Sequence, residues 1–157
     1  MVSLRRTRPS DDDFAALVKE LDRELFERYP EFQDDNDFLN IVPPDARVIV
    51  AYDNGVPVGC GCFKDTIDPG EAELKRMFVR RDSRGRGISK LICGELEKWA
   101  AETGYRRMIL ETGVRQPEAI GLYESAGFRK INNYGEYQEN GMSVCMEKVL
   151  IICKQNS

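Results

Sequence analysis

The sequence predicts an α/β domain in which helices flank one central sheet, and three observations support this prediction. β-rich runs alternate with turn signals, apolar residues recur at helical spacing in three segments, and the 157 residues contain no internal repeat or linker. A chain of this length is typical of one compact domain. We therefore expect a single domain over residues 1–157, with the element order β-α-α-β-β-β-α-β-α-β-β.

The N-terminal part is predicted to combine a short strand with a long amphipathic helix. The strand covers residues 4–8, and Ser10 with Asp13 three residues later is typical of a helix capping box. Helical spacing then continues to about Arg28 through Phe14, Leu17, Val18, Leu21 and Leu25. Residues 31–45 are acidic and contain two adjacent prolines, so we expect a loop with a short helix there.

Three strands are predicted to follow as a meander. The first two cover residues 47–52 and 56–64, and Asp53-Asn54-Gly55 between them is a strong signal for a tight turn. A second turn signal, Asp68-Pro69-Gly70, precedes the third strand at residues 72–79.

The C-terminal half is predicted to alternate helices and strands. A loop over residues 80–87 leads into an amphipathic helix that begins at Ile88, and Gly104 is a suitable residue just beyond its end. Pro117 is well placed at the start of the next helix. The helix that starts at Pro117 is predicted to run to Ala126. The remaining predicted elements are strands at 107–111, 128–133 and 143–150.

The residue types present exclude several kinds of chemistry. The chain contains no histidine, so histidine triads and histidine metal ligands are excluded, and proton transfer must use Glu, Asp, Tyr, Cys, Lys or water. The five cysteines are odd in number and scattered, which argues against a disulfide framework. Cys60 and Cys62 are too close for a zinc knuckle and no second pair exists, so we expect no metal. Buried thiols of this kind favour a reducing, cytoplasmic setting.

The charge pattern favours a small anionic ligand over a polymer. A net charge of −4 disfavours nonspecific binding to nucleic acid. Basic residues nevertheless cluster at Lys75-Arg76, Arg80-Arg81, Arg84 and Arg86, which predicts a local site for a phosphate-bearing ligand. The chain has no run of 18 apolar residues and no signal-peptide pattern, so we expect neither a membrane span nor secretion.

Residues 84–90, Arg-Gly-Arg-Gly-Ile-Ser-Lys, lie at a predicted strand-to-helix transition. Glycines there let the backbone approach a ligand closely. The free N–H groups at the start of the following helix favour a pyrophosphate. The segment matches neither the P-loop pattern nor the Gly-x-Gly-x-x-Gly pattern of dinucleotide-binding domains.

A second block, from Gln116 to Phe128, combines a helix, a tyrosine and a Gly-Phe exit into a strand. Together the two blocks resemble the GNAT superfamily of acyl-CoA-dependent N-acyltransferases. Arg84, Gly87 and Ser89 fill the places of its first motif, with serine where the family has glycine or alanine. Gln116 stands where the family often has asparagine. The residues that match the second motif are Ala119, Leu122, Tyr123, Glu124, Gly127 and Phe128.

The resemblance implies a mostly antiparallel sheet and a metal-free N-acetyltransferase that uses acetyl-CoA and a primary amine. Tyr123 would lie near the thioester sulfur and act as general acid during direct attack by the amine. The residues expected to contact the cofactor are Met77, Phe78 and Val79 through the backbone, Arg84, Gly85, Arg86, Gly87, Ile88, Ser89 and Lys90 around the pyrophosphate, and Gln116 and Tyr123.

Two carboxylates are candidates for the general base that the amine requires. Glu73 lies on the strand that leads to the loop and resembles the position of a catalytic glutamate in some family members. Glu111, at the end of the next predicted strand, competes with it. Either could act directly or through water if burial raises its pKa, and water alone remains a third candidate.

The sequence leaves three further alternatives open. The same motifs fit a regulatory module that binds acyl-CoA without turnover, and they do not separate acetyl-CoA from a longer acyl-CoA. The acceptor, a small-molecule or peptide amine, is not identified, and a homodimer is left open. Residues considered for the acceptor side are Glu31, Asp34, Asp35, Asp37, Tyr134 and Tyr137.

Overall fold

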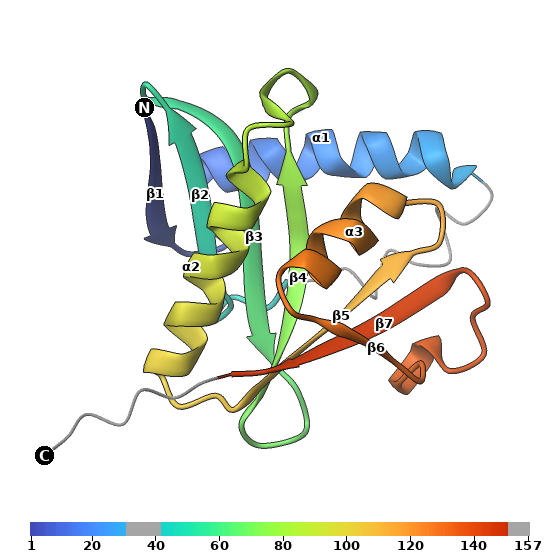
Figure 1. The fold of residues 1–157 in the computed structure, drawn as a ribbon. Coiled ribbons are helices and arrows are strands. Elements are labelled where there is room, and N and C mark those ends of the chain that lie inside the picture. Colours follow the sequence, from blue (N-terminus) through green and yellow to red (C-terminus); the bar gives the residue numbers. More distant parts are fainter. Residues whose placement is uncertain (31–41, 151–157) are drawn as a thin grey trace, which may run out of the picture.

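The computed structural model describes residues 1–30 and 42–150 of the chain (Figure 1). Within these residues seven strands form one sheet in the order β1-β2-β3-β4-β5-β7-β6. The strands are β1 (Val2–Thr7), β2 (Arg47–Asp53), β3 (Val56–Asp65), β4 (Glu71–Val79), β5 (Arg107–Gly113), β6 (Arg129–Ile131) and β7 (Ser143–Val149). The helices are α1 (Asp12–Arg28), α2 (Ile88–Glu102) and α3 (Pro117–Ser125), with short 3-10 turns at Arg81–Ser83 and Gly135–Tyr137.

The predicted fold class is confirmed. Neighbouring strands are antiparallel throughout the described sheet except for β4 and β5. The extra helix predicted within residues 31–45 falls mainly on residues 31–41, which lie outside the described residues, and residues 42–46 form no helix. In the described part of the chain, no helix has the length and apolar character needed to cross a membrane.

α1 begins one residue later than the sequence predicts, and its cap is Asp11 rather than Ser10. Asp11 Oδ1 accepts hydrogen bonds from the backbone N–H groups of Asp13 at 2.8 Å and Phe14 at 3.2 Å. The hydroxyl of Thr7, on β1, donates to the other carboxylate oxygen at 2.8 Å. Asp11 therefore satisfies two helix N–H groups and also links α1 to β1.

The helices cover both faces of the sheet, with α1 on one face and α2 and α3 on the other (Figure 1). The alternation of strand side chains explains the two layers. Val48 lies in a buried cluster with Phe14 and Leu17 of α1. Ile49, the next residue, lies in the larger cluster with Leu96 of α2. β2 thus contributes to both hydrophobic cores.

β4 and β5 pair over only part of their lengths. Glu71–Leu74 align in parallel with Arg107–Leu110. Beyond these four pairs β4 continues to Val79 and β5 continues to Gly113, and the strands diverge (Figure 1). An opening is left in the middle of the sheet, bordered by strand edges whose backbone groups do not pair across it.

A bulge in β4 accompanies this divergence. Arg76 has a φ of +57°, in the left-handed region that side chains rarely adopt. The register between β3 and β4 shifts in the same region, between Cys60 and Cys62. Because a bulge bends its strand and increases the local twist, it directs the second half of β4 away from β5.

Candidate active site

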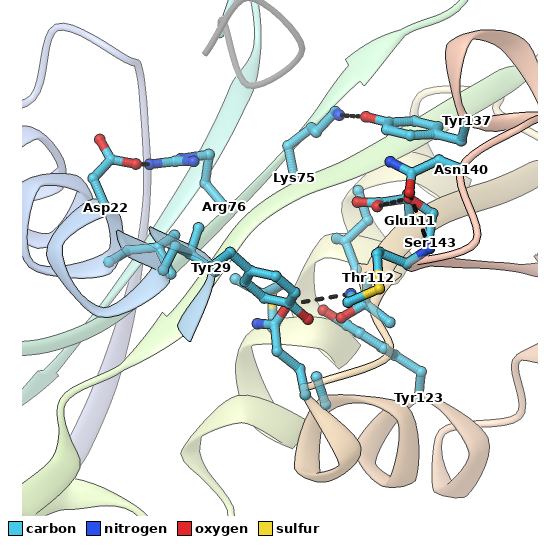
Figure 2. A pocket seen from close by; sticks show the side chains of 18 of the residues that line it. Asp22, Tyr29, Lys75, Arg76, Glu111, Thr112, Tyr123, Tyr137, Asn140 and Ser143 are labelled. Carbon is cyan, nitrogen blue, oxygen red and sulfur yellow. Dashed lines mark hydrogen bonds and ion pairs between the residues drawn. The ribbon is translucent and has the colours of Figure 1, made fainter. Parts of the chain in front are cut away.

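A cavity of about 400 Å³ lies where β4 and β5 separate (Figure 2). Its walls come from both strands, from α1 and α3, and from the segment before β7. Because α1 and α3 cover opposite faces, the cavity is reached by side chains from both sides of the sheet. Its titratable lining residues are Asp22, Tyr29, Lys75, Arg76, Glu111, Tyr123 and Tyr137.

Tyr123 lies on α3 and points from that helix into the cavity (Figure 2). Only 6% of its surface is exposed, and its ring packs edge-on against Phe128 with 5.7 Å between the centroids. Burial raises the pKa of the phenol far above its usual range, and Cys93 and Glu111 raise it further. The hydroxyl therefore remains protonated at neutral pH and can donate a proton or a hydrogen bond.

Glu111 lies on the β5 wall of the cavity and is half-buried. The hydroxyl of Ser143 donates a hydrogen bond to Glu111 Oε2 at 2.7 Å. Burial raises the pKa of this carboxyl; the Ser143 bond and the charge of Lys75 partly oppose that rise. A carboxylate with a raised pKa is a stronger base than an exposed one, which suits it to accept a proton.

Glu73, the other predicted base, is buried on β4 and is not among the residues that line the cavity. Its carboxylate already has several partners. The hydroxyl of Tyr134 donates to Oε2 at 2.8 Å, and the ammonium groups of Lys64 and Lys75 each lie 3.6 Å from an oxygen. Of the two predicted carboxylates, Glu111 is the one that the structure brings to the cavity with Tyr123.

The two tyrosines expected on the acceptor side occupy different positions. Tyr137 lines the cavity, and its hydroxyl accepts a hydrogen bond from Lys75 Nζ at 2.9 Å. Tyr134 packs edge-on against Tyr137 and directs its hydroxyl to Glu73 instead. The acidic residues at positions 31–37 lie outside the described residues.

Arg76 contributes a buried cation to the cavity wall. Its left-handed backbone costs about 1–3 kcal/mol for a residue with a side chain, a strain that tends to occur at functional sites. Its side chain is 4% exposed, and Nη2 pairs with Asp22, whose side chain is 61% exposed. The buried Nε atom has no hydrogen-bond partner among the described residues.

The predicted phosphate loop follows β4 and leads directly into α2. Gly85 and Gly87 have φ values of +79° and +76°, which glycine adopts without strain. α2 begins at Ile88, directly after Gly87, and no side chain caps this end. The N–H groups of its first turn have no acceptor within the helix, so this end is suited to an anion.

The arginines of the loop are held by protein carboxylates. Arg84 donates to Glu24 of α1 at 2.8 Å and to the carbonyl oxygen of Val79 at 2.8 Å. Arg86 pairs with Asp53 at 2.7 Å. The basic residues predicted to form one anion site are therefore divided among several ion pairs. The backbone N–H groups of the loop, by contrast, can meet a phosphate without exchanging partners.

The side chains of the other predicted cofactor residues differ in how far they are exposed to the cavity or to solvent. Met77 lines the cavity, whereas the side chains of Phe78 and Val79 are buried on opposite faces of the sheet, so only their backbone can reach a ligand. In the first turn of α2, Ile88 is buried in the core, and Ser89 and Lys90 are more exposed.

Gln116 lines the cavity just before α3, and its side chain holds a local turn. Gln116 Oε1 accepts a hydrogen bond from the N–H of Gly113 at 3.2 Å. Tyr29, at the end of α1, accepts one from the N–H of Arg115 at 2.9 Å and lies directly against Gly113. A side chain at Gly113 would overlap with Tyr29, so the glycine allows α1 to meet the end of β5.

The structure adds residues that the sequence did not predict for the site, mainly Asp22, Tyr29, Arg76 and Ser143. Arg76 was recognised only as part of a basic cluster. Cys60 and Cys62 are buried on β3, where burial raises the pKa of Cys62 to about 12. In residues 1–30 and 42–150, no group of three or more metal-binding side chains comes together.

Comparisons with known proteins show the family of the chain and relatives of its fold. A model of the acetyltransferase (GNAT) family matches residues 14–128. The IAA acetyltransferase of Azospirillum brasilense is 37% identical over 150 residues, which cover 95% of this chain and 98% of that protein. The candidate acyl-CoA N-acyltransferase of Klebsiella pneumoniae has a TM-score of 0.80 and 28% identity, over 96% of this chain and 99% of its own. The PaiA N-acetyltransferase of Thermoplasma acidophilum, solved with coenzyme A, shares the fold with a TM-score of 0.70 and 18% identity, over 94% of this chain and 99% of its own.

Proposed function

The chain belongs to the GNAT family of acetyltransferases, and from this we propose that it transfers the acetyl group of acetyl-CoA to a primary amine. The observation that carries the proposal is the cavity between β4 and β5. Tyr123, a protonated phenol, and Glu111, a carboxyl with a raised pKa, both line it. One space therefore holds the acid and the base that transfer to an amine requires, without histidine.

The loop before α2 supports acetyl-CoA as the donor. Acetyl-CoA supplies an activated thioester and carries a pyrophosphate that needs an anion site. Gly85 to Lys90 provide backbone N–H groups at a helix N-terminus for that site. The edge of β4 at Met77 to Val79, beyond the pairing with β5, runs from this loop toward the cavity. Apart from the Val79 carbonyl, which Arg84 engages, the backbone groups on this edge are available to the amides of the pantetheine arm. The PaiA structure with coenzyme A is a parallel at the level of the fold.

Tyr123 and Glu111 divide the proton transfers between them. As nitrogen forms the new C–N bond and the C–S bond breaks, Tyr123 gives its proton to the sulfur, and Glu111 takes the proton that nitrogen loses. Return of that proton to Tyr123 through solvent restores both groups. Ser143 holds the Glu111 carboxylate in place by its hydrogen bond. We favour Glu111 over Glu73 as the base because Glu73 lies outside the cavity lining and is held by Tyr134.

Release of free thiol from acetyl-CoA, measured with and without a panel of primary amines, tests this function. We expect amine-dependent thiol release and a mass increase of one acetyl group on the amine. Longer acyl-CoA donors in the same assay measure the donor preference. Tight binding of acetyl-CoA with no amine-dependent release for any acceptor would contradict the proposal and favour a regulatory module.

A further inference from the structure

Arg76 lines the cavity, and only part of one edge of its guanidinium group is in use. Nη2 pairs with Asp22, and the neighbouring Nε has no hydrogen-bond partner among the described residues. The Nε–H and the adjacent Nη2–H of an arginine point in parallel and match the two oxygens of a carboxylate. A buried donor without an acceptor is unfavourable, so this edge is suited to a ligand that brings two oxygens.

Asp22 pairs with Arg76 from a position that it can leave. Its side chain is 61% exposed, whereas that of Arg76 is 4% exposed. An exposed carboxylate loses little free energy when it leaves an ion pair and is solvated by water. Arg76, by contrast, needs an anion because a buried charge without a partner is strongly unfavourable. A carboxylate from a ligand can therefore replace Asp22 and also engage the Nε atom.

The other walls of the cavity indicate what the rest of the ligand contains. Figure 2 shows Arg76 and Asp22 on one side and Glu111 with Ser143 on the other, with Lys75 between them. One side thus presents a buried cation and the opposite side presents the proposed base. The apolar part of the lining includes Leu21, Leu25, Phe26, Leu74 and Met142.

We propose that the acceptor of this enzyme is an amino-carboxylate, whose carboxylate binds the Nε–Nη2 edge of Arg76 while its amine faces Glu111. The inference rests on the proposed function and names the substrate class of the same cavity. The Arg76 side chain is buried in this wall, and it selects among amines without taking part in the chemistry.

Matched pairs of acceptors test the inference. Each pair consists of an amino acid and its carboxamide. The pairs differ from one another in side-chain size and in the distance between the amine and the carboxylate. We expect kcat/KM for the best acid to exceed that for its amide by on the order of tenfold to a hundredfold, because two charge-assisted hydrogen bonds are lost. The amine of the amide is less basic, and this bias opposes the expected preference.

Two variants connect the preference to Arg76. Arg76→Lys keeps the charge but loses the paired donors, so KM for the acid should rise about tenfold or more and KM for the amide should change little. Asp22→Asn removes the competing carboxylate and leaves the buried Arg76 without its anion until the acid binds, so KM for the acid should fall. Arg80→Lys is the matched control: Arg80 pairs with Glu20 of α1 at 2.9 Å but does not line the cavity, so the preference should persist.

The outcomes separate this inference from the function on which it rests. If no amine in the panel is acetylated, the proposed function is overturned, and the inference with it. Transfer to acids and amides with equal kcat/KM leaves the function standing and overturns the inference. An acid preference that survives in a folded Arg76→Lys variant, or a KM for the acid that rises in Asp22→Asn, also overturns it.

Discussion

At the residue scale, the proposed chemistry depends most on the hydroxyl of Tyr123. Tyr123→Phe keeps the buried ring and removes only the proton donor, so the single-turnover rate should fall while the affinity for acetyl-CoA changes little. General acids contribute on the order of 10²–10⁴-fold. Because burial also makes this phenol a weak acid, we expect a loss near the lower end of that range, and at least about tenfold.

Tyr105→Phe is a control for the loss of a tyrosine hydroxyl elsewhere. Tyr105 bonds to Arg47 and Asp65 through its hydroxyl and does not line the cavity, so its removal should leave the single-turnover rate unchanged. A folded Tyr123→Phe protein with the wild-type rate would remove Tyr123 from the mechanism.

The hydrogen bond from Ser143 should control the pH dependence of the reaction. Glu111 must be ionised to act as a base, so the rate should rise with pH through a pKa that burial places above the usual value of about 4.3. The Ser143 bond lowers this pKa, so in Ser143→Ala it should rise and the acidic limb of kcat/KM should move to higher pH. Glu111→Gln should lower kcat on the order of 10²-fold and abolish that limb.

The raised pKa of Glu111 should make the reaction rate rise with pH, but it should make the stability of the fold decrease with pH. The folded state holds the proton on Glu111 at pH values where the unfolded state has released it, so stability should fall as pH rises from the unfolded pKa to the folded one. Urea unfolding of Glu111→Gln across this window should show a weaker dependence on pH than the wild type.

For the kinetic prediction, an acidic limb of kcat/KM that does not move in Ser143→Ala would argue against Glu111 as the base.

The sequence pointed to some of the residues that line the cavity or form the loop and gave no sign of others. Tyr123 and Gly87 are identified by motifs whose spacing is local. Arg76 lies in a β-rich run with no glycine or asparagine beside it to signal a left-handed residue, and its conformation arises from the register of β4 on β3. Asp22 and Tyr29 reach the cavity only because α1 packs across the sheet, a long-range contact that local patterns do not encode.

At the element scale, most boundaries were predictable because turn and cap residues mark them. The start of α1 shows the limit of such signals, since Ser10 and Asp11 are both good capping residues. Contacts with β1 decide between them: Thr7 and Arg5 both bind the carboxylate of Asp11. The choice therefore depends on how the helix meets the strand.

Gly87 allows a test of the loop that leads into α2. Gly87→Val places a branched side chain at a φ of +76°, which is strained and displaces the loop, so acetyl-CoA affinity should fall at least about tenfold by calorimetry. Gly94→Ala is a matched control within α2. No atom lies within 4 Å of the added Cβ, and helix propensity should stabilise the fold by about 1 kcal/mol while acetyl-CoA affinity is unchanged. Unchanged affinity in a folded Gly87→Val protein would contradict the loop assignment.

At the scale of the whole molecule, the sheet consists of two parts joined by a short parallel pairing. β1 to β4 form one part and β5 to β7 the other, and four residue pairs between β4 and β5 connect them. The order of the strands and of α1, α2 and α3 was predictable from turns and periodicity, and the mostly antiparallel sheet from the resemblance to the GNAT superfamily. The divergence of β4 from β5 was not predictable, because the sequence of β4 is β-rich throughout and carries no signal for a bulge. The cavity, and with it the proposed function, depends on that divergence.

Acetyl-CoA should stabilise the whole fold, because the proposed site spans both parts of the sheet. A ligand that binds only the folded state adds about 2.7 kcal/mol at 100 times its Kd. For a chain of this size that gain corresponds to a rise in Tm of about 5–10 °C. Thermal unfolding followed by circular dichroism should show one transition that moves upward with ligand concentration. Gly87→Val should show no rise at the same concentrations, whereas Gly94→Ala should show the wild-type increment above its own higher Tm. A transition that splits, with β1 to β4 stabilised alone, would mean that the ligand contacts only the loop and does not reach the β5 wall with Glu111.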